Sequence, residues 1–264
     1  MIYLYLFLVF FAGYILGNIN FARIFSWAFA KKDITTVGSK NPGTMNMLRT
    51  RGFGEAFLTL IFEAIKAGLP ALVFYFVFKE YLTGYENVAY FLTAFGAIVG
   101  HCFPVFYKFK GGKGVACTFG MFVFHPQFWW ISLIVFVICF FLFFFIDYPF
   151  IISMLFILTM TICATVMYAL EFNAYLIAVL VILWLNFLLI LFMHRGNIKR
   201  LLTGKENKVH FKDKIFKKHK KDSVEENNSA DVTEPDESKA EPTEKLAETA
   251  EKTSEKTDDK TTTD

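Results

Sequence analysis

Three short segments combine glycine with cationic and amide side chains in patterns that could bind phosphate groups. The first, which we call motif 1, reads G-S-K-N-P-G-T-M-N-M-L-R over residues 38–49. Motif 2 reads H-C-F-P-V-F-Y-K-F-K-G-G-K-G-V-A over residues 101–116, and motif 3 reads H-R-G-N-I-K-R-L-L-T-G-K-E over residues 194–206. Glycine lets backbone amides turn toward an anion, while arginine and lysine supply charge and donors. Each motif is therefore a candidate anion site, although each taken alone also fits an ordinary basic loop.

The side chains of motifs 1 and 2 offer different groups to a phosphate. In motif 1, Ser39 offers a hydroxyl and Arg49 a planar guanidinium suited to phosphate. In motif 2, Lys110 and Lys113 flank glycines at the entry of a helix, where amides and the positive helix end favour an anion. The spacing of a Walker A loop is absent. His101, at the start of motif 2, fits a packing histidine equally well.

Motif 3 places His194 and Asn197 three residues apart. On a continuing helix these side chains would share one face and could act on one hydroxyl or phosphate. A basic flank that stops membrane insertion is the alternative, and it explains the arginines and lysines but not the histidine and asparagine. A separate pair, Glu63 and Lys66, lies inside an apolar run, and we predict a structural ion pair bordering the site rather than a catalytic one.

The elements that must position these motifs are apolar. Of 264 residues, 55% are hydrophobic and 34 are phenylalanine, a load that suits a bilayer better than a soluble fold. Six nearly uncharged runs have the length of a membrane-spanning helix. They are Ile2–Phe21, Ala56–Phe78, Val88–Phe106, Phe128–Ile146, Phe150–Leu170 and Ala174–Met193.

The number of crossings follows from the distribution of charge. The three motifs carry most of the lysine and arginine outside the C-terminal region, so the positive-inside rule puts them in the cytoplasm and the N-terminus outside. Motifs 2 and 3 then lie on the same side, so an even number of crossings must separate them. Three long apolar runs follow motif 2, and a fourth, short helix is therefore required at Val115–Phe124, before His125-Pro126. The predicted fold is all-α and polytopic, with about seven transmembrane helices and a cytoplasmic C-terminus. Merging the short helix with its neighbour gives five.

Domain limits follow from composition. We expect a membrane domain over residues 1–203, a basic juxtamembrane segment over 204–221 and a disordered acidic tail over 222–264. The first apolar run lacks the basic start of a signal peptide, so we expect a retained span. The four cysteines lie in apolar segments without metal-ligand spacing, and no metal or other cofactor is implied.

The three motifs resemble the signatures of the bacterial acyl-phosphate:glycerol-3-phosphate acyltransferase family. That family's patterns are G-S-G-N-x-G-A-T-N-x-x-R, H-x-F-P-x-F-x-x-F-K-G-G-K-G-V-A and H-R-x-N-I-x-R-L-x-x-G-x-E, and the resemblance covers about residues 13–206. Lys40 replaces a glycine of the first pattern, Thr44-Met45 replaces Ala-Thr, and Glu63 stands for aspartate. Thr35 stands where the family usually has arginine, and residues 17–22 match a G-S-x-P-x-G pattern only loosely.

The resemblance implies an enzyme of the bacterial cell membrane with a site facing the cytoplasm. It would transfer an acyl group from acyl-phosphate to the 1-hydroxyl of glycerol 3-phosphate, and a partner enzyme would make the donor from acyl carrier protein. Membrane lipid surrounds it, and no nucleic acid is expected. We assign catalysis to Ser39, Arg49, His194 and Asn197. Binding of acyl-phosphate is assigned to Gly38, Ser39, Asn41, Gly43, Asn46 and Arg49. Binding of glycerol 3-phosphate is assigned to Lys110, Gly111, Gly112, Lys113, Gly114, His194 and Asn197. Structural roles are assigned to Glu63, Lys66, His101 and Glu206.

Two alternatives bear on these assignments. The H-x-x-x-x-D motif of other glycerolipid acyltransferases is absent, because no histidine has an aspartate five residues later. A transporter or channel for an anionic solute would also explain the helices and basic loops, but it predicts a repeat relating the two halves, which the sequence lacks. Whether His194 or a substrate phosphate takes the proton of the hydroxyl stays open.

Overall fold

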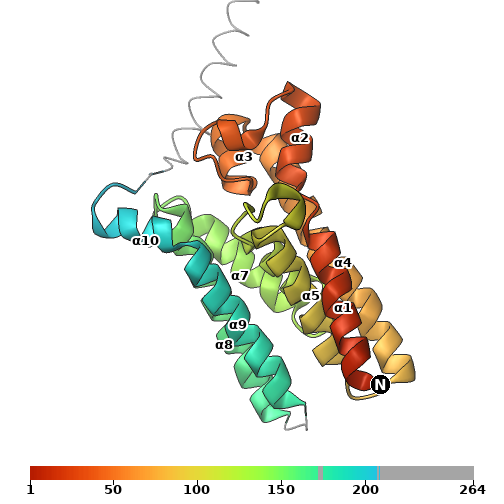
Figure 1. Cartoon of the computed structure of the whole chain (residues 1–264). Helices are drawn as coiled ribbons and strands as arrows, with labels where there is room; N and C mark the ends of the chain where they lie inside the picture. Colours follow the sequence, from red (N-terminus) through yellow and green to blue (C-terminus); the bar gives the residue numbers. More distant parts are fainter. Residues whose placement is uncertain (172–174, 207, 209–264) are drawn as a thin grey trace, which may run out of the picture. The chain divides into compact units, whose positions relative to one another are not determined.

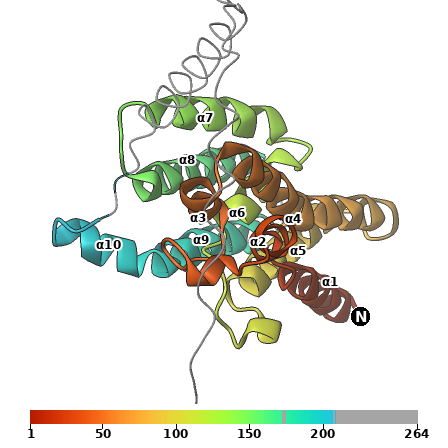
Figure 2. The ribbon, with the colours of Figure 1, turned by 90° about the horizontal axis from the view of Figure 1, so that it is seen from above.

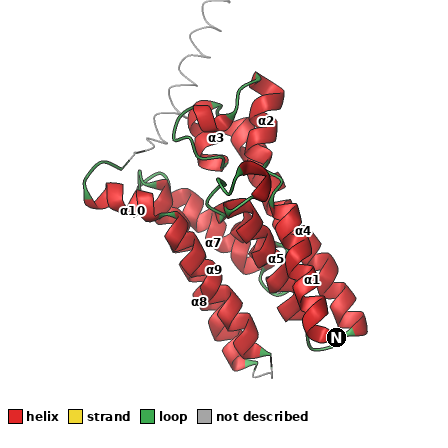
Figure 3. Ribbon diagram, in the orientation of Figure 1, coloured by secondary structure: helices red, strands yellow, loops and turns green. Residues whose placement is uncertain are grey.

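The computed structural model describes residues 1–171, 175–206 and 208, and every regular element in this part of the chain is helical (Figure 3). The chain divides into two units, residues 1–214 and 215–264, and the described residues all belong to the first. The predicted acidic tail, and most of the predicted juxtamembrane segment, lie outside the described residues. The helices are α1 (Ile2–Gly17), α2 (Phe21–Ala30), α3 (Thr44–Thr50), α4 (Phe53–Tyr81), α5 (Glu86–Cys102), α6 (Val115–Val123), α7 (Trp129–Leu142), α8 (Pro149–Leu170), α9 (Leu176–Met193) and α10 (Arg195–Leu202), with 3₁₀ turns η1 (Ile34–Thr36) and η2 (Val105–Tyr107).

The predicted apolar runs all form helices, but their lengths support fewer long spans than predicted. Five helical stretches have the length and composition to cross a membrane: residues 2–30, α4, residues 86–107 (α5 with η2), α8 and α9. The first of these is interrupted between α1 and α2, while α7 has 14 residues and α6 has nine. The all-α, polytopic class is confirmed, whereas the count of seven crossings stays a prediction.

The short helix expected before His125-Pro126 is present as α6. A residue that precedes proline disfavours helical backbone, and α6 ends just before this pair. The His125 ring is fully buried, lies 4.6 Å from the Tyr90 ring centroid, and its Nε2 is 3.1 Å from Asn87 Oδ1. The turn between α6 and α7 is therefore held by a packed, hydrogen-bonded histidine.

Helices α1 and α5 approach each other through glycine. A Cβ placed on Gly13 would meet the carbonyl oxygen of Thr93 at 2.1 Å, and one on Gly96 would meet that of Phe10 at 2.2 Å. Glycines four residues apart on both helices, at 13 and 17 and at 96 and 100, face the partner backbone in this way. In a bilayer, where the hydrophobic effect does not drive helices together, such close contact through small residues is a main source of association.

The motifs gather at one end of the helix bundle. In Figure 1, α2, α3, α10 and the segment that joins α5 to α6 lie together at the end opposite the N-terminus. Seen from above in Figure 2, α1 and α7 lie at different edges of the bundle, and α6 lies near its centre. The long helices therefore present all three motifs at one end.

The glycine contact yields a direct test of the fold. Gly96→Val should lower the melting temperature in detergent by about 5–10 °C, because the added side chain forces α1 and α5 apart. Gly54→Val is the matched control, since nothing lies within 4 Å of its added Cβ. Equal melting temperatures for the two variants would contradict the close α1–α5 contact.

Candidate active site

One cavity of about 1150 Å³ is lined by residues of all three motifs. The predicted site residues that line it are Ser39, Asn41, Gly43, Asn46, Arg49, Lys110, Gly111, Lys113, Gly114, His194 and Asn197, together with Glu63, His101 and Glu206. Gly38, Gly112 and Lys66 do not line it. The structure thus unites segments that lie far apart in the sequence.

Asn46 organises motif 1. Its Oδ1 accepts the backbone N–H of Ser39 at 2.8 Å, and its Nδ2 donates to the carbonyl oxygens of Ile34 and Val37, both at 3.0 Å. Gly38 has a φ of +57°, and a Cβ there would meet Asn46 Oδ1 at 2.3 Å. Both residues therefore shape the loop that presents Ser39, and Gly38 lies outside the cavity that it was predicted to line.

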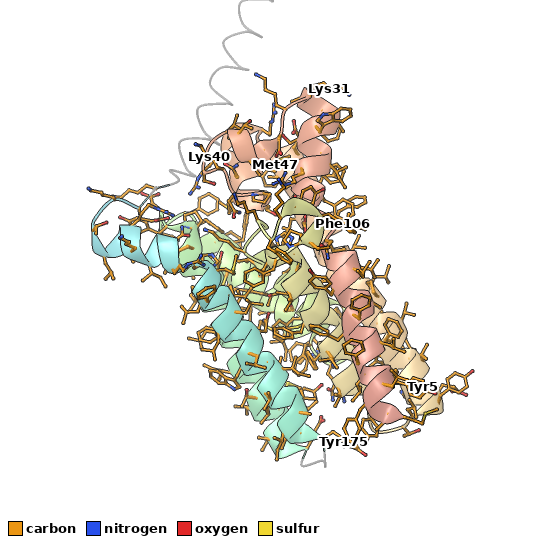
Figure 4. The ribbon with its side chains drawn as sticks, in the orientation of Figure 1. Tyr5, Lys31, Lys40, Met47, Phe106 and Tyr175 are labelled. Atoms are coloured by element: carbon orange, nitrogen blue, oxygen red, sulfur yellow. The ribbon has the colours of Figure 1, made fainter. Side chains whose placement is uncertain are left out.

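Lys40 occupies the position where the family pattern has glycine. Its φ of +59° is in the left-handed region, which disfavours residues with a Cβ and explains why glycine suits this position. Figure 4 shows Lys40 at the same end of the bundle as Met47 and Phe106, opposite Tyr5 and Tyr175. Lys40 lines the cavity, so this chain adds a cation where the pattern has none.

The glycines of motif 2 allow close packing on His101. A Cβ on Gly112 would meet His101 Nε2 at 2.0 Å, and one on Gly111 would meet the carbonyl oxygen of His101 at 2.0 Å. The N–H of Gly112 donates to the same carbonyl oxygen at 3.0 Å. The predicted use of Gly112 as a phosphate ligand is therefore not supported, because its amide is already bonded and the residue is buried away from the cavity.

The predicted Glu63–Lys66 ion pair is present and is buried. Glu63 Oε2 lies 2.5 Å from Lys66 Nζ and 3.0 Å from Nδ1 of His101. Lys66 Nζ is also 3.0 Å from His101 Nδ1. Cys117 Sγ completes a compact group of Glu63, His101 and Cys117 donor atoms, in which the ammonium of Lys66 already serves as the cation. The pair joins α4 to the start of motif 2.

His194 does not continue the helix that precedes it. The residue joins α9 to α10 with φ −94° and ψ 6°, so the premise that His194 and Asn197 share a face of one helix is wrong. Figure 1 shows α10 turning away from the axis of α9, as expected where polar Arg195, Lys199 and Arg200 leave the apolar layer. Both His194 and Asn197 nevertheless line the cavity, because the turn brings them there.

A hydrogen-bonded chain links motifs 2 and 3. Lys113 Nζ donates to Asn197 Oδ1, and Asn197 Nδ2 donates to Glu206 Oε1 at 2.7 Å. Glu206 Oε2 accepts from Arg200 Nε at 2.9 Å. A nearly buried carboxylate therefore stands among the cations of the cavity, which agrees with the structural role predicted for Glu206.

Burial changes the protonation of two site residues. Desolvation lowers the pKa of Lys113 to about 8, and the charges of Arg200 and Arg49 act in the same direction while Glu206 opposes them. Burial likewise lowers the pKa of His194 to about 4, assisted by the charge of Lys113. His194 Nδ1 lies 2.9 Å from the carbonyl oxygen of Ile190 and must donate to it, so Nε2 of the neutral ring keeps its lone pair.

The cavity also has an apolar wall that sequence reasoning missed. Phe53 and Phe57 of α4 line it, as do Phe119 of α6 and Phe140 of α7 and Phe156 of α8. Arg23 and Arg200 line its polar part and were not assigned either. Phenylalanines that line a cavity carry no local signal in a chain whose spans are full of phenylalanine.

The chain is similar to known membrane acyltransferases along most of its length. The family model for glycerol-3-phosphate acyltransferase matches residues 7–204. A glycerol-3-phosphate acyltransferase of Neisseria meningitidis serogroup C is 39% identical over 197 residues, covering 75% of this chain and 94% of that protein. One from Francisella tularensis subsp. novicida is 37% identical over 202 residues, covering 76% and 92%.

Two solved structures of PlsY, an integral membrane glycerol 3-phosphate acyltransferase, have the same fold. The glycerol 3-phosphate form is 30% identical with a TM-score of 0.63, and the match covers 77% of this chain and 95% of that one. The lysophosphatidic acid form is 31% identical with a TM-score of 0.63, covering 80% and 98%. On the matched length, the fold and the meeting of the three motifs in one cavity, this chain belongs to the glycerol-3-phosphate acyltransferase family of integral membrane proteins.

Proposed function

We propose that this protein transfers an acyl group from acyl-phosphate to the 1-hydroxyl of glycerol 3-phosphate, giving lysophosphatidate and inorganic phosphate. The observation that carries the proposal is the composition of this cavity, where a cationic part made of three motifs adjoins a wall of phenylalanine. An acyl-phosphate matches both parts, because it has an anionic phosphate head and an apolar acyl chain. The related PlsY structures are a glycerol 3-phosphate form and a lysophosphatidic acid form, which agrees with this reaction.

The cations of the cavity must hold two phosphates that repel each other. Ser39 and Arg49 would hold the phosphate of the acyl donor beside the phenylalanine wall. Lys110 and Lys113 would hold glycerol 3-phosphate, with Asn197 fixing the Lys113 ammonium. Bringing the hydroxyl next to an already activated carbonyl is most of the catalytic task, because a mixed anhydride has a good leaving group.

The transfer balances without a cofactor. The oxygen of the 1-hydroxyl attacks the carbonyl carbon, the bond between that carbon and the phosphate oxygen breaks, and phosphate leaves with the electron pair. The hydroxyl proton passes to a phosphate oxygen. A phosphate monoester has a second pKa of about 6. His194, with a pKa of about 4, is the weaker base. We therefore propose that neutral His194 orients glycerol 3-phosphate by accepting a hydrogen bond through Nε2 from its other hydroxyl, so that the proton of the 1-hydroxyl is free to pass to the phosphate.

The rival function, transport of an anionic solute, accounts less well for the same features. Transport of an anionic solute does not require the phenylalanine wall or a neutral His194. Membership of an acyltransferase family also favours the enzyme.

The cellular setting is also a proposal. We propose that α6 and α7 complete seven crossings, that the cavity opens to the bacterial cytoplasm, and that a partner enzyme supplies acyl-phosphate made from acyl carrier protein. The shared position of the basic motifs supports the cytoplasmic placement, because positive charge is retained on that side.

The assignment of the two phosphates is tested by steady-state kinetics in detergent. Arg49→Ala should raise the KM for acyl-phosphate by roughly 10- to 150-fold, and Lys113→Ala should do the same for glycerol 3-phosphate, since each loses a charge-assisted hydrogen bond. Arg49→Lys should stay impaired, because an ammonium lacks the planar fork.

Matched controls come from neighbouring cations outside the cavity lining, Arg51→Ala and Lys108→Asn, which should stay within about twofold of the wild type. Lysophosphatidate and phosphate release is the readout. If Lys113→Ala affected acyl-phosphate alone, the two pockets would be reversed, and no product from the wild type would refute the proposed function.

The lowered pKa of Lys113 predicts a pH dependence. Because the amine loses its charge as pH rises through about 8, kcat/KM for glycerol 3-phosphate should fall above that pH, approaching tenfold per unit. Lys113→Arg keeps its charge and should show a much flatter profile, whatever its absolute rate. A profile of Lys113→Arg that fell as steeply as the wild type would exclude Lys113 as the titrating group.

The proposed topology is tested with single added cysteines. Lys40→Cys, Lys108→Cys and Lys199→Cys should react with an impermeant thiol reagent only from the cytoplasmic face, and Thr83→Cys only from outside. The native cysteines are buried or half-buried, so the unmodified protein gives the background. Labelling of any two motif positions from opposite faces would rule out one shared site.

A further inference from the structure

The break between α1 and α2 is stabilised by the buried ion pair of α4. Lys66 Nζ donates to the carbonyl oxygens of Gly17 and Ile19, at 3.1 and 2.5 Å. Glu63 Oε1 accepts the N–H of Phe21, the first residue of α2, at 2.8 Å. The cation thus meets the end of α1 and the anion the start of α2, which is the arrangement that helix dipoles favour.

Two buried asparagines lie in this break, and each is bonded to a different motif. Asn20 caps α2, where its Oδ1 accepts the N–H of Arg23 at 2.9 Å, while its Nδ2 donates to the carbonyl oxygen of Pro42 at 3.2 Å. Pro42 lies within motif 1 and lines the cavity. Asn20 therefore joins the α1–α2 break to motif 1.

Asn18 joins the same break to motif 2. Its Oδ1 accepts the N–H of Val105 at 2.6 Å, and its Nδ2 donates to the carbonyl oxygen of Tyr14 at 2.6 Å. Val105 begins the turn η2, which leads toward Lys110 and Lys113. Asn18 and Asn20 are 1% and 2% exposed, so water does not replace these bonds.

The two side chains differ from the residues of the family pattern. In G-S-x-P-x-G the corresponding positions carry serine and proline, and proline has no side-chain donor for Pro42. In this chain the contact with motif 1 therefore depends on an amide that the pattern does not supply.

We propose that Asn18 and Asn20 are positioning residues, Asn20 holding motif 1 for the acyl donor and Asn18 holding motif 2 for the acceptor. The division between the two substrates rests on the proposed function. Neither asparagine lines the cavity, so each acts through the backbone of its motif.

Two readouts test the proposal, one of which is independent of catalysis. In hydrogen exchange followed by mass spectrometry, Asn20→Ala should raise exchange in residues 38–49 and Asn18→Ala in residues 101–114. In kinetics, Asn20→Ala should raise the KM for acyl-phosphate and Asn18→Ala that for glycerol 3-phosphate, each by roughly 5- to 30-fold with a smaller change for the other substrate.

Conservative variants separate the helix cap from the bond to motif 1. Asn20→Ser keeps a capping oxygen for Arg23 but is too short to reach Pro42, so it should behave like Asn20→Ala in both readouts. Asn18→Asp keeps the acceptor for Val105 but loses the donor to the Tyr14 carbonyl oxygen, so it should restore the exchange pattern of motif 2 only in part. Asn186→Ala removes another fully buried asparagine, outside the cavity lining, and controls for general destabilisation.

Exchange that rises equally in both motifs, or a pattern matching Asn186→Ala, would overturn the positioning role. Wild-type KM values for both substrates in Asn20→Ser would overturn the role of the bond to Pro42. If each variant raised exchange only in its own motif but the wild-type protein showed no acyl transfer, the proposed function would be refuted and the positioning role would stand.

Discussion

The buried pair of Glu63 and Lys66 is the interaction on which the site geometry depends. A charged side chain in the bilayer is costly, so each member needs the other and further polar partners. Here those partners are backbone groups at the α1–α2 break and the ring of His101. Removal of one member would leave an uncompensated charge, at a cost of about 3–5 kcal/mol. Because α4, the break and the start of motif 2 meet at this pair, it locates two motifs at once.

The cations of the cavity impose a second constraint. Burial lowers the pKa of Lys113, and the charges of Arg200 and Arg49 lower it further. Glu206 lies among them, bonded to Arg200 and to Asn197. A buried carboxylate offsets part of the repulsion between the cations, and Asn197 fixes the direction of the Lys113 ammonium. The site is thereby arranged for anions before they bind, which limits reorganisation during the reaction.

Small residues provide the precision of the scaffold. The glycines of α1 and α5 allow backbone contact, and Gly68 and Gly120 do the same for α4 and α6. Near the motifs, Gly112 lets the loop lie on the His101 ring. Since lipid competes for apolar side chains, close packing and hydrogen bonds carry much of the specificity between helices.

Local sequence pattern determined the features that depend on neighbouring residues. The apolar runs predicted the helices, His125-Pro126 predicted the end of α6, and the i, i+3 spacing predicted the Glu63–Lys66 pair. The glycine and lysine content of the motifs, strengthened by family resemblance, predicted where the polar site residues lie. The predictions of the helices and of the ion pair held because helix formation and ion pairing along one helix are local.

Tertiary structure decided what depends on contacts between distant segments. Asn18 meets a residue 87 positions away, and the phenylalanine wall combines α4, α6, α7 and α8. His194 reaches the cavity through a turn between α9 and α10, not on the continuous helix that its spacing with Asn197 suggested. Gly112 supports His101 where its motif suggested an anion ligand. Such roles are set by which backbones approach closely, and a one-dimensional pattern does not contain that information.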